Sequence, residues 1–146
     1  MKKLVLITFF ACMALWGCAH DGSKRTDTAL DLQGARILDT RWKLVELWGK
    51  PVAGIERYPF IQLHSKEGRM SGFGGCNSVS GAYELRNGMR LRFTNMASTM
   101  MACPDMELER EFFNVLDMTD NFACDGKTLF LHKARMAPLA RFEAVD

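Results

Sequence analysis

The chain has 146 residues, of which 48% are hydrophobic and 25% are charged, so it has the composition of a globular protein and room for one domain. Its formal net charge is +2, and the excess comes from Lys2 and Lys3 at the N-terminus. Without these two lysines the chain carries 17 basic and 17 acidic side chains. This balance excludes the positive field on which nucleic-acid binding depends.

The N-terminus has the layout of a secretory signal. The two lysines precede an apolar run over residues 4–15, which is shorter than the roughly 20 apolar residues that a membrane-spanning helix needs. The sequence LWGC, ending at Cys18, then resembles a bacterial lipobox, in which the cysteine is acylated after cleavage. We predict a signal peptide over residues 1–17 and lipidation of Cys18. The alternative is an ordinary signal peptidase site that discards Cys18.

The residues after Cys18 bear on where the protein is held. Ala19 follows the cysteine, and by resemblance to enterobacterial sorting rules this implies the periplasmic face of the outer membrane. Residues 18–35 are largely polar and are predicted to form the lipidated cysteine and a flexible tether. Such a tether spans on the order of 20–25 Å by random-coil scaling. Residues 36–146 would then form a domain held just off the membrane surface.

Three cysteines remain in the domain: Cys76, Cys103 and Cys124. An exported protein meets an oxidising compartment, so one disulfide is expected, and three pairings are possible. We favour Cys76–Cys103, because Cys76 follows a Gly-Phe-Gly-Gly turn and Cys103 precedes Pro104, which places both near the ends of elements. Cys124 falls in a predicted strand, where a buried thiol behaves as a small hydrophobe. The alternative for the odd thiol is a redox sensor or an intermolecular bridge.

Short strands separated by turn residues dominate the domain. Asn87-Gly88 and Asp125-Gly126 are strong hairpin signals. Residues 49–59 hold two prolines and two glycines and are predicted to be a loop. The strands are predicted at residues 40–48 (with a bulge), 60–64, 69–73, 81–85, 89–93, 122–124, 128–131 and 139–145.

One helix interrupts the strands. Apolar residues recur at helical spacing between residues 105 and 119, after Pro104, and acidic residues occupy the first turn, where the helix dipole favours them. Those carboxylates are interpreted as a solvated face. The whole pattern predicts a β-rich α+β domain, an antiparallel curled sheet or partly open barrel of about seven to eight strands with one helix.

No catalytic constellation stands out. His64 and His132 are isolated in predicted strands, away from metal-ligand spacing. The glycine-rich stretch over residues 72–77 lacks the Lys-Ser/Thr of a phosphate loop, and we interpret it as a tight turn. We therefore predict no enzyme activity, no cofactor and no metal site.

Four methionines cluster around Cys103: Met96, Met100, Met101 and Met106. Their favoured interpretation is adaptable filling of the core around the helix and the disulfide. The alternative is a Cu(I) site, because thioethers bind that ion in the periplasm.

Four sequence motifs together resemble the META domain, or HslJ-like, family of bacterial envelope proteins. They are TRWKL starting at Thr40, SGFGGCN ending at Asn77, MAC ending at Cys103 and LARF ending at Phe142. The resemblance covers about residues 38–145. Its signature residues in this chain are Trp42, Gly72, Gly74, Gly75, Cys76, Asn77 and Cys103.

The resemblance implies a β-rich, partly open barrel with a helix. It also implies a role in heat-shock or envelope stress and in tolerance of the antibiotic novobiocin, without an established enzyme activity. We therefore predict a non-enzymatic lipoprotein that binds an envelope protein or a small apolar ligand. One alternative is a pilotin-like or lipid-binding chaperone module. A second is a periplasmic copper- or redox-responsive protein.

Overall fold

A computed structural model of the chain describes residues 34, 36–104 and 106–145. The signal peptide, the lipidation of Cys18 and most of the tether lie outside these residues and stay predictions. Within the described part of the chain, no helix is both long and apolar enough to cross a membrane.

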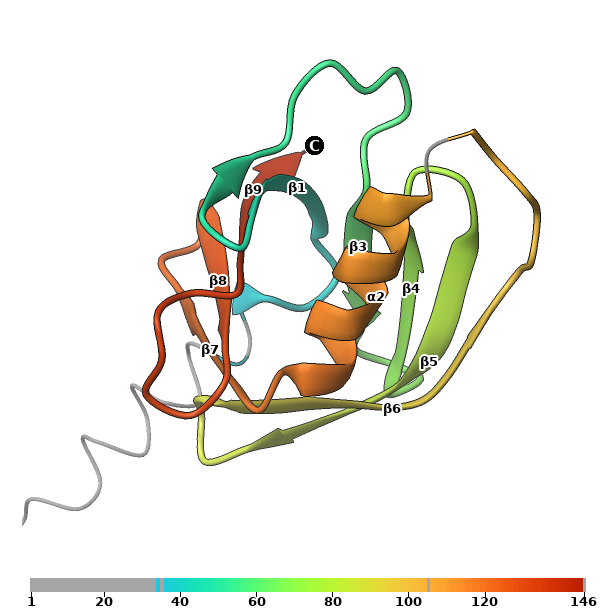
Figure 1. The fold of residues 1–146 in the computed structure, drawn as a ribbon. Coiled ribbons are helices and arrows are strands. Elements are labelled where there is room, and N and C mark those ends of the chain that lie inside the picture. Colours follow the sequence, from blue (N-terminus) through green and yellow to red (C-terminus); the bar gives the residue numbers. More distant parts are fainter. Residues whose placement is uncertain (1–33, 35, 105, 146) are drawn as a thin grey trace, which may run out of the picture.

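The described residues form one antiparallel sheet and helix α2 (Figure 1). Along the sheet the strands follow the order β6-β5-β4-β3-β1-β9-β8-β7, and the short β2 pairs with β1 at the side of this path. The elements are β1 (Arg41–Leu47), β2 (Lys50–Pro51), β3 (Phe60–His64), β4 (Arg69–Phe73), β5 (Ser78–Arg86), β6 (Arg90–Ser98), α2 (Glu107–Met118), β7 (Asn121–Cys124), β8 (Thr128–His132) and β9 (Ala140–Val145).

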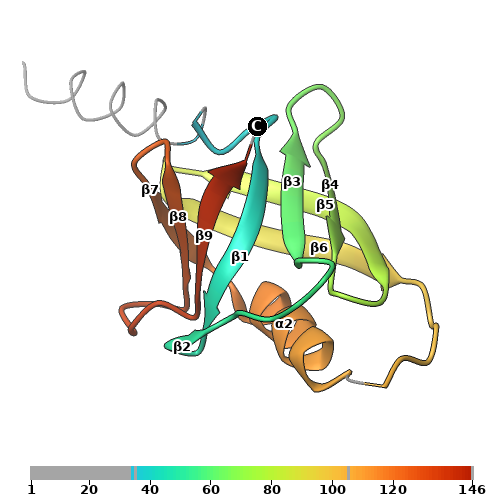
Figure 2. The ribbon, with the colours of Figure 1, turned by 90° about the horizontal axis from the view of Figure 1, so that it is seen from above.

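The sheet curls until its two end strands approach each other. The backbone N–H of Phe122 on β7 donates a hydrogen bond of 2.9 Å to the carbonyl of Met89, next to β6. Helix α2 lies inside this curl, as Figure 1 shows, and it covers the open side of the sheet in Figure 2. The predicted fold class, a curled antiparallel sheet wrapped on one helix, is therefore confirmed.

Large side chains fill the space between the helix and the sheet. Phe112 of α2 and Phe142 of β9 are fully buried, with ring centroids 6.2 Å apart. Trp42 of β1 is fully buried as well, and its indole Nε1–H donates to the carbonyl of Ile37 at 3.0 Å. A buried indole needs such a partner, because an unpaired N–H costs free energy there. An acyl chain could enter this interior only by displacing these side chains.

Local sequence signals explain the turn between β5 and β6 and the bulge in β1. Asn87 and Gly88 both adopt positive φ angles, 51° and 66°, and connect β5 to β6 as the Asn-Gly signal predicted. The predicted bulge in β1 is also present, as a register shift between Leu44 and Glu46 against β9.

Two predictions in these strands were wrong. The loop over residues 49–59 begins with a short strand, β2, because Trp48 and Gly49 adopt φ angles of 52° and 73° and reverse the chain after β1. The strand predicted to begin at residue 89 begins at Arg90, and Met89 lies in the turn before β6, where it is 48% exposed.

Candidate functional site

The glycine-rich turn between β4 and β5 lies directly against helix α2. The backbone N–H of Gly74 donates to the carbonyl of Asn77 at 2.8 Å. A Cβ atom on Gly74 would lie 2.6 Å from Cγ of Glu109 and 2.9 Å from the ring of Phe113, so only glycine fits between turn and helix. Gly75 has a φ of 114°, a conformation that L side chains rarely adopt.

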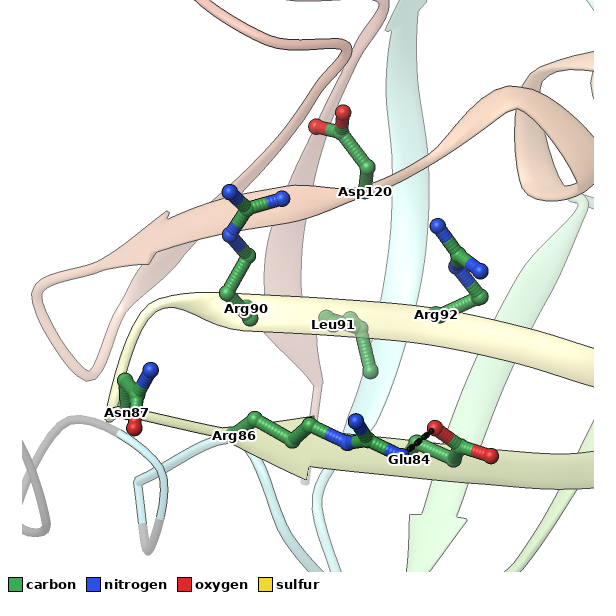
Figure 3. A pocket seen from close by; sticks show the side chains of 7 residues that line it. All are labelled: Glu84, Arg86, Asn87, Arg90, Leu91, Arg92 and Asp120. Carbon is green, nitrogen blue, oxygen red and sulfur yellow. Dashed lines mark ion pairs between the residues drawn. The ribbon is translucent and has the colours of Figure 1, made fainter.

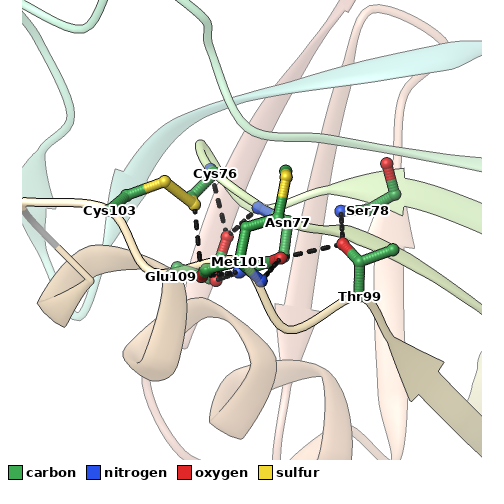
Figure 4. Close-up of a disulfide and its surroundings, with 7 residues drawn as sticks. All are labelled: Cys76, Asn77, Ser78, Thr99, Met101, Cys103 and Glu109. Atoms are coloured by element: carbon green, nitrogen blue, oxygen red, sulfur yellow. Dashed lines mark hydrogen bonds between the residues drawn. A yellow bond between two sulfur atoms is a disulfide. The ribbon is translucent and has the colours of Figure 1, made fainter.

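Asn77 follows this turn and is 1% exposed. Its side-chain Nδ2 donates to Oε1 of Glu109 at 2.7 Å and to the carbonyl of Met101 at 3.0 Å. Its Oδ1 accepts hydrogen bonds from the backbone N–H of Met101 at 2.7 Å and from Oγ1 of Thr99 at 2.8 Å (Figure 4). The single amide therefore ties the turn both to the helix and to the segment that follows β6.

Glu109 completes the network from the helix side, and it is 4% exposed. Its Oε2 accepts from the backbone N–H groups of Cys76 and Asn77, which gives the turn partners that no neighbouring strand supplies. The interpretation of the acidic helix start as a solvated face was wrong for this residue. Glu109 lies three and seven residues before Phe112 and Leu116, on the buried side of the helix, and that spacing is the signal that could have identified it.

A disulfide joins Cys76 of the turn to Cys103, the pairing favoured from the sequence. The two Cα atoms are 6.2 Å apart, and the residues are separated by 27 positions in the chain. Figure 4 shows the bridge beside the hydrogen bonds of Asn77 and Glu109. The segment over residues 99–104 is therefore fastened to the turn covalently and by hydrogen bonds.

A groove of about 540 Å³ opens between this segment and the start of helix α2, and we call it the methionine groove. Three of its methionines are exposed: Met100 by 95%, Met101 by 54% and Met106 by 39%. The groove is lined by Asn77, Ser98, Thr99, Met100, Met101, Ala102, Met106, Glu109, Arg110 and Phe113.

The interpretation of these methionines as core filling was wrong for all three. Among the four clustered methionines only Met96 packs against the core. The side chain of Asn77 forms hydrogen bonds with both the N–H and the carbonyl of Met101. Because these bonds fix the backbone of the segment on the outside of the turn, its methionine side chains do not pack into the core.

Two further signature residues lie away from the groove. Trp42 belongs to the core, and Gly72 lies within β4. A Cβ atom on Gly72 would lie 2.7 Å from the carbonyl oxygen of Phe60 and 3.0 Å from Cγ1 of Val79, so this glycine allows close packing between neighbouring strands.

The remaining candidate groups show ordinary structural contacts. Cys124 is a buried free thiol, and burial raises its pKa, with a smaller opposing contribution from the N–H of Gly126. A raised pKa keeps the thiol protonated and poorly reactive. His64 shares a hydrogen bond of 2.8 Å with Oγ of Ser71. Over residues 34, 36–104 and 106–145, no group of three or more His, Cys, Asp and Glu side chains could hold a metal ion.

Solved structures share this fold. One NMR structure is 25% identical, with a TM-score of 0.59, and the match covers 75% of this chain and 92% of that chain. An NMR structure of a protein from Burkholderia xenovorans is 20% identical, with a TM-score of 0.60, over 99% of this chain and 95% of that chain. A DUF4847 family protein from Bacteroides vulgatus is 14% identical, with a TM-score of 0.56, over 73% and 93% of the two chains.

Comparison with protein families gives a match to the whole described domain, whereas no curated protein matches the chain. The model of the META domain family matches residues 35–146. The matched region contains the braced turn, the disulfide, Asn77 and Glu109. This chain belongs to the META domain family.

Proposed function

We propose that this protein is a non-enzymatic outer-membrane lipoprotein that binds a partner protein through the methionine groove. In this proposal it acts in the envelope or heat-shock stress response and in antibiotic tolerance. The META domain family is not a known enzyme family. The observation that carries the proposal is the exposure of three neighbouring methionines on a rigidly held segment.

The groove combines a fixed backbone with adaptable side chains. Asn77 and the disulfide hold the segment, so partner binding would not have to order it, and ordering a loop is a large part of the cost of association. Methionine has three rotatable bonds and a polarisable thioether, so it adapts to apolar partners of varied shape. Grouped exposed apolar side chains mark interaction surfaces in soluble domains.

The lining of the groove favours a protein partner over the two alternative functions. Glu109 and Arg110, the two charged residues in the lining, supply no soft ligand for Cu(I). No histidine lies among the lining residues, and the neighbouring cysteines are joined in the disulfide, which leaves only thioethers as soft ligands. An acyl chain of the lipid-binding alternative could enter the interior of the domain only by displacing the aromatic core described above.

Replacing Met101 by glutamate is expected to abolish function without unfolding the domain. A charge at the centre of an apolar contact weakens binding by about 10-fold or more, as for interface residues whose truncation costs at least ~1–2 kcal/mol. The measurement is survival of a deletion strain under heat and novobiocin, after complementation with the variant gene. A photoreactive amino acid at position 100 gives a second readout, a crosslinked product in intact envelopes that M101E removes.

The matched control is Met136→Glu. Met136 is 58% exposed against 54% for Met101, and it lies in the loop between β8 and β9, outside the methionine groove. Both variants should keep the melting temperature of the parent, since both side chains are exposed. The proposal is contradicted if M101E restores full survival to the deletion strain, or if M101E and M136E reduce survival equally.

Replacing Cys18 by alanine tests the anchor. We expect the variant to accumulate as an uncleaved precursor and to incorporate no labelled palmitate, because lipoprotein processing requires the cysteine thiol. Metabolic labelling and membrane fractionation measure both effects. Cys12→Ala, within the predicted signal peptide, is the control and should label normally. A Cys18→Ala protein that is fully matured and still bound to membranes contradicts the lipoprotein assignment.

A further inference from the structure

A second surface, distinct from the methionine groove, lies at the β5–β6 hairpin. Three arginines gather there around a pocket of about 490 Å³, which we call the arginine pocket (Figure 3). Its lining residues are Glu84, Arg86, Asn87, Arg90, Leu91, Arg92 and Asp120.

Some of the charged side chains in this pocket have a partner within the domain, and others do not. Arg86 forms an ion pair of 2.9 Å with Glu84. Asp120 uses its Oδ1 to accept hydrogen bonds from Nδ2 of Asn121 and from the backbone N–H of Ala134, both at 2.7 Å.

Arg90 and Arg92 alternate with the buried Leu91, so both guanidinium groups lie on the outer face of β6. Neither forms an ion pair with any residue that the structure describes. The pocket therefore presents two guanidinium groups without ion-pair partners on one face of β6, with the carboxylate of Asp120 between them in Figure 3. Guanidinium groups of this kind suit the oxygens of a phosphate group.

The pocket lies at the end of the domain where the described chain begins. The side chain of Arg36 reaches the β7–β8 turn. A Cβ atom added to Gly126 in that turn would lie 4.0 Å from Cδ of Arg36. The hairpin reaches the same corner through the hydrogen bond from Phe122 to Met89. Figures 1 and 2 agree on this placement, and both show the N-terminal end of α2, beside the methionine groove, at the opposite end of the domain.

We infer that the arginine pocket binds the phosphate of an anionic phospholipid headgroup and orients the domain on the membrane. The inference rests on the proposed anchor, because the tether from Cys18 to Gly34 keeps the domain on the order of 20–25 Å from the bilayer or closer. With the pocket against the membrane, the methionine groove points away from it. Since the mature chain has no net charge, this attraction is local to the pocket.

The test uses the chain from residue 18 onward with Cys18→Ser, which keeps every described residue and carries no lipid. Its binding is measured by co-sedimentation with vesicles of phosphatidylcholine alone and with vesicles that also contain about one third phosphatidylglycerol. We expect binding only to the anionic vesicles. Replacing Arg90 and Arg92 together by glutamine should lower the partition coefficient by roughly 30-fold, since each basic residue contributes about 1 kcal/mol near an anionic surface.

The control is the double variant Lys50→Gln/Arg57→Gln, which removes the same charge from exposed positions outside both the arginine pocket and the methionine groove. It should partition like the parent. The inference is overturned if the parent binds both kinds of vesicle equally, or if the two double variants lower the partition coefficient onto anionic vesicles by the same factor. Binding of inorganic phosphate in calorimetry without any binding to anionic vesicles also overturns it, in favour of a soluble anion. Because the assay chain carries no lipid, these results do not depend on whether Cys18 is acylated in the cell.

Discussion

Asn77→Asp is expected to lower the free energy of unfolding by about 3–5 kcal/mol, the range seen when a buried charge is left uncompensated by the loss of its ion-pair partner. The substitution keeps the shape of the side chain but replaces the donor Nδ2 by an acceptor oxygen. That oxygen would face Oε1 of Glu109 at the 2.7 Å of the present hydrogen bond, and it would also face the carbonyl of Met101. Two carboxylates and a carbonyl would then meet at a site that water does not reach.

Urea denaturation at neutral pH measures this loss, and two further variants make it specific. Asn114→Asp introduces the same change at an exposed position of α2 and should stay within about 0.5 kcal/mol of the parent. Adding Glu109→Gln to Asn77→Asp should recover part of the loss, because the new amide can donate to the aspartate. If Asn77→Asp is as mild as Asn114→Asp, the network does not hold the turn in the way described here.

Replacing Cys76 and Cys103 together by serine is expected to cost about 3–4 kcal/mol. The bridge closes a loop with a sequence separation of 27, and in the chain-entropy model a loop of this length contributes that amount by restricting the unfolded chain. This is a large share of the stability of a small domain. Chemical denaturation of the double variant and of the parent, with and without reductant, measures the effect.

The free cysteine provides the control for this experiment. Cys124→Ala removes a sulfur atom from a buried site without touching the bridge and should cost only about 1 kcal/mol. Reduction should destabilise the parent and leave the double variant unchanged. In unreduced, unfolded parent protein that begins at residue 19 or later, maleimide should label Cys124 alone. Labelling of Cys76 or Cys103 in that sample means that the pairing is wrong.

The hairpins and the curled sheet could be predicted because their signals are local. Asn87-Gly88 and Asp125-Gly126 encode their turns within two residues. Buried and exposed residues alternate in β5 and β6 on either side of Asn87-Gly88, a pattern that needs no distant partner. The helix was also evident from the spacing of its apolar residues. Local signals of this kind determine whether a segment is a strand, a turn or a helix, even where the observed strand ends differ from the predicted ones by a few residues.

The features that the sequence did not reveal depend on contacts between distant segments. Glu109 is buried because the N–H groups of a turn 32 and 33 residues earlier need an acceptor. Met100 and Met101 are exposed because Asn77 holds the backbone of their segment on the outside of that turn. Neither contact has a signature in a local window of sequence, although the place of Glu109 on the apolar stripe of the helix was a usable clue.

The Cys76–Cys103 disulfide also links the methionine groove to the compartment in which the chain folds. In a reducing environment the segment over residues 99–104 would be held by the hydrogen bonds of Asn77 and lack the covalent brace. For the exported lipoprotein proposed above, oxidation after export would supply that brace. In that proposal the segment that carries Met100 and Met101 becomes fully braced only after the chain has left the cytoplasm, so the rigid form of the groove would belong to the exported protein.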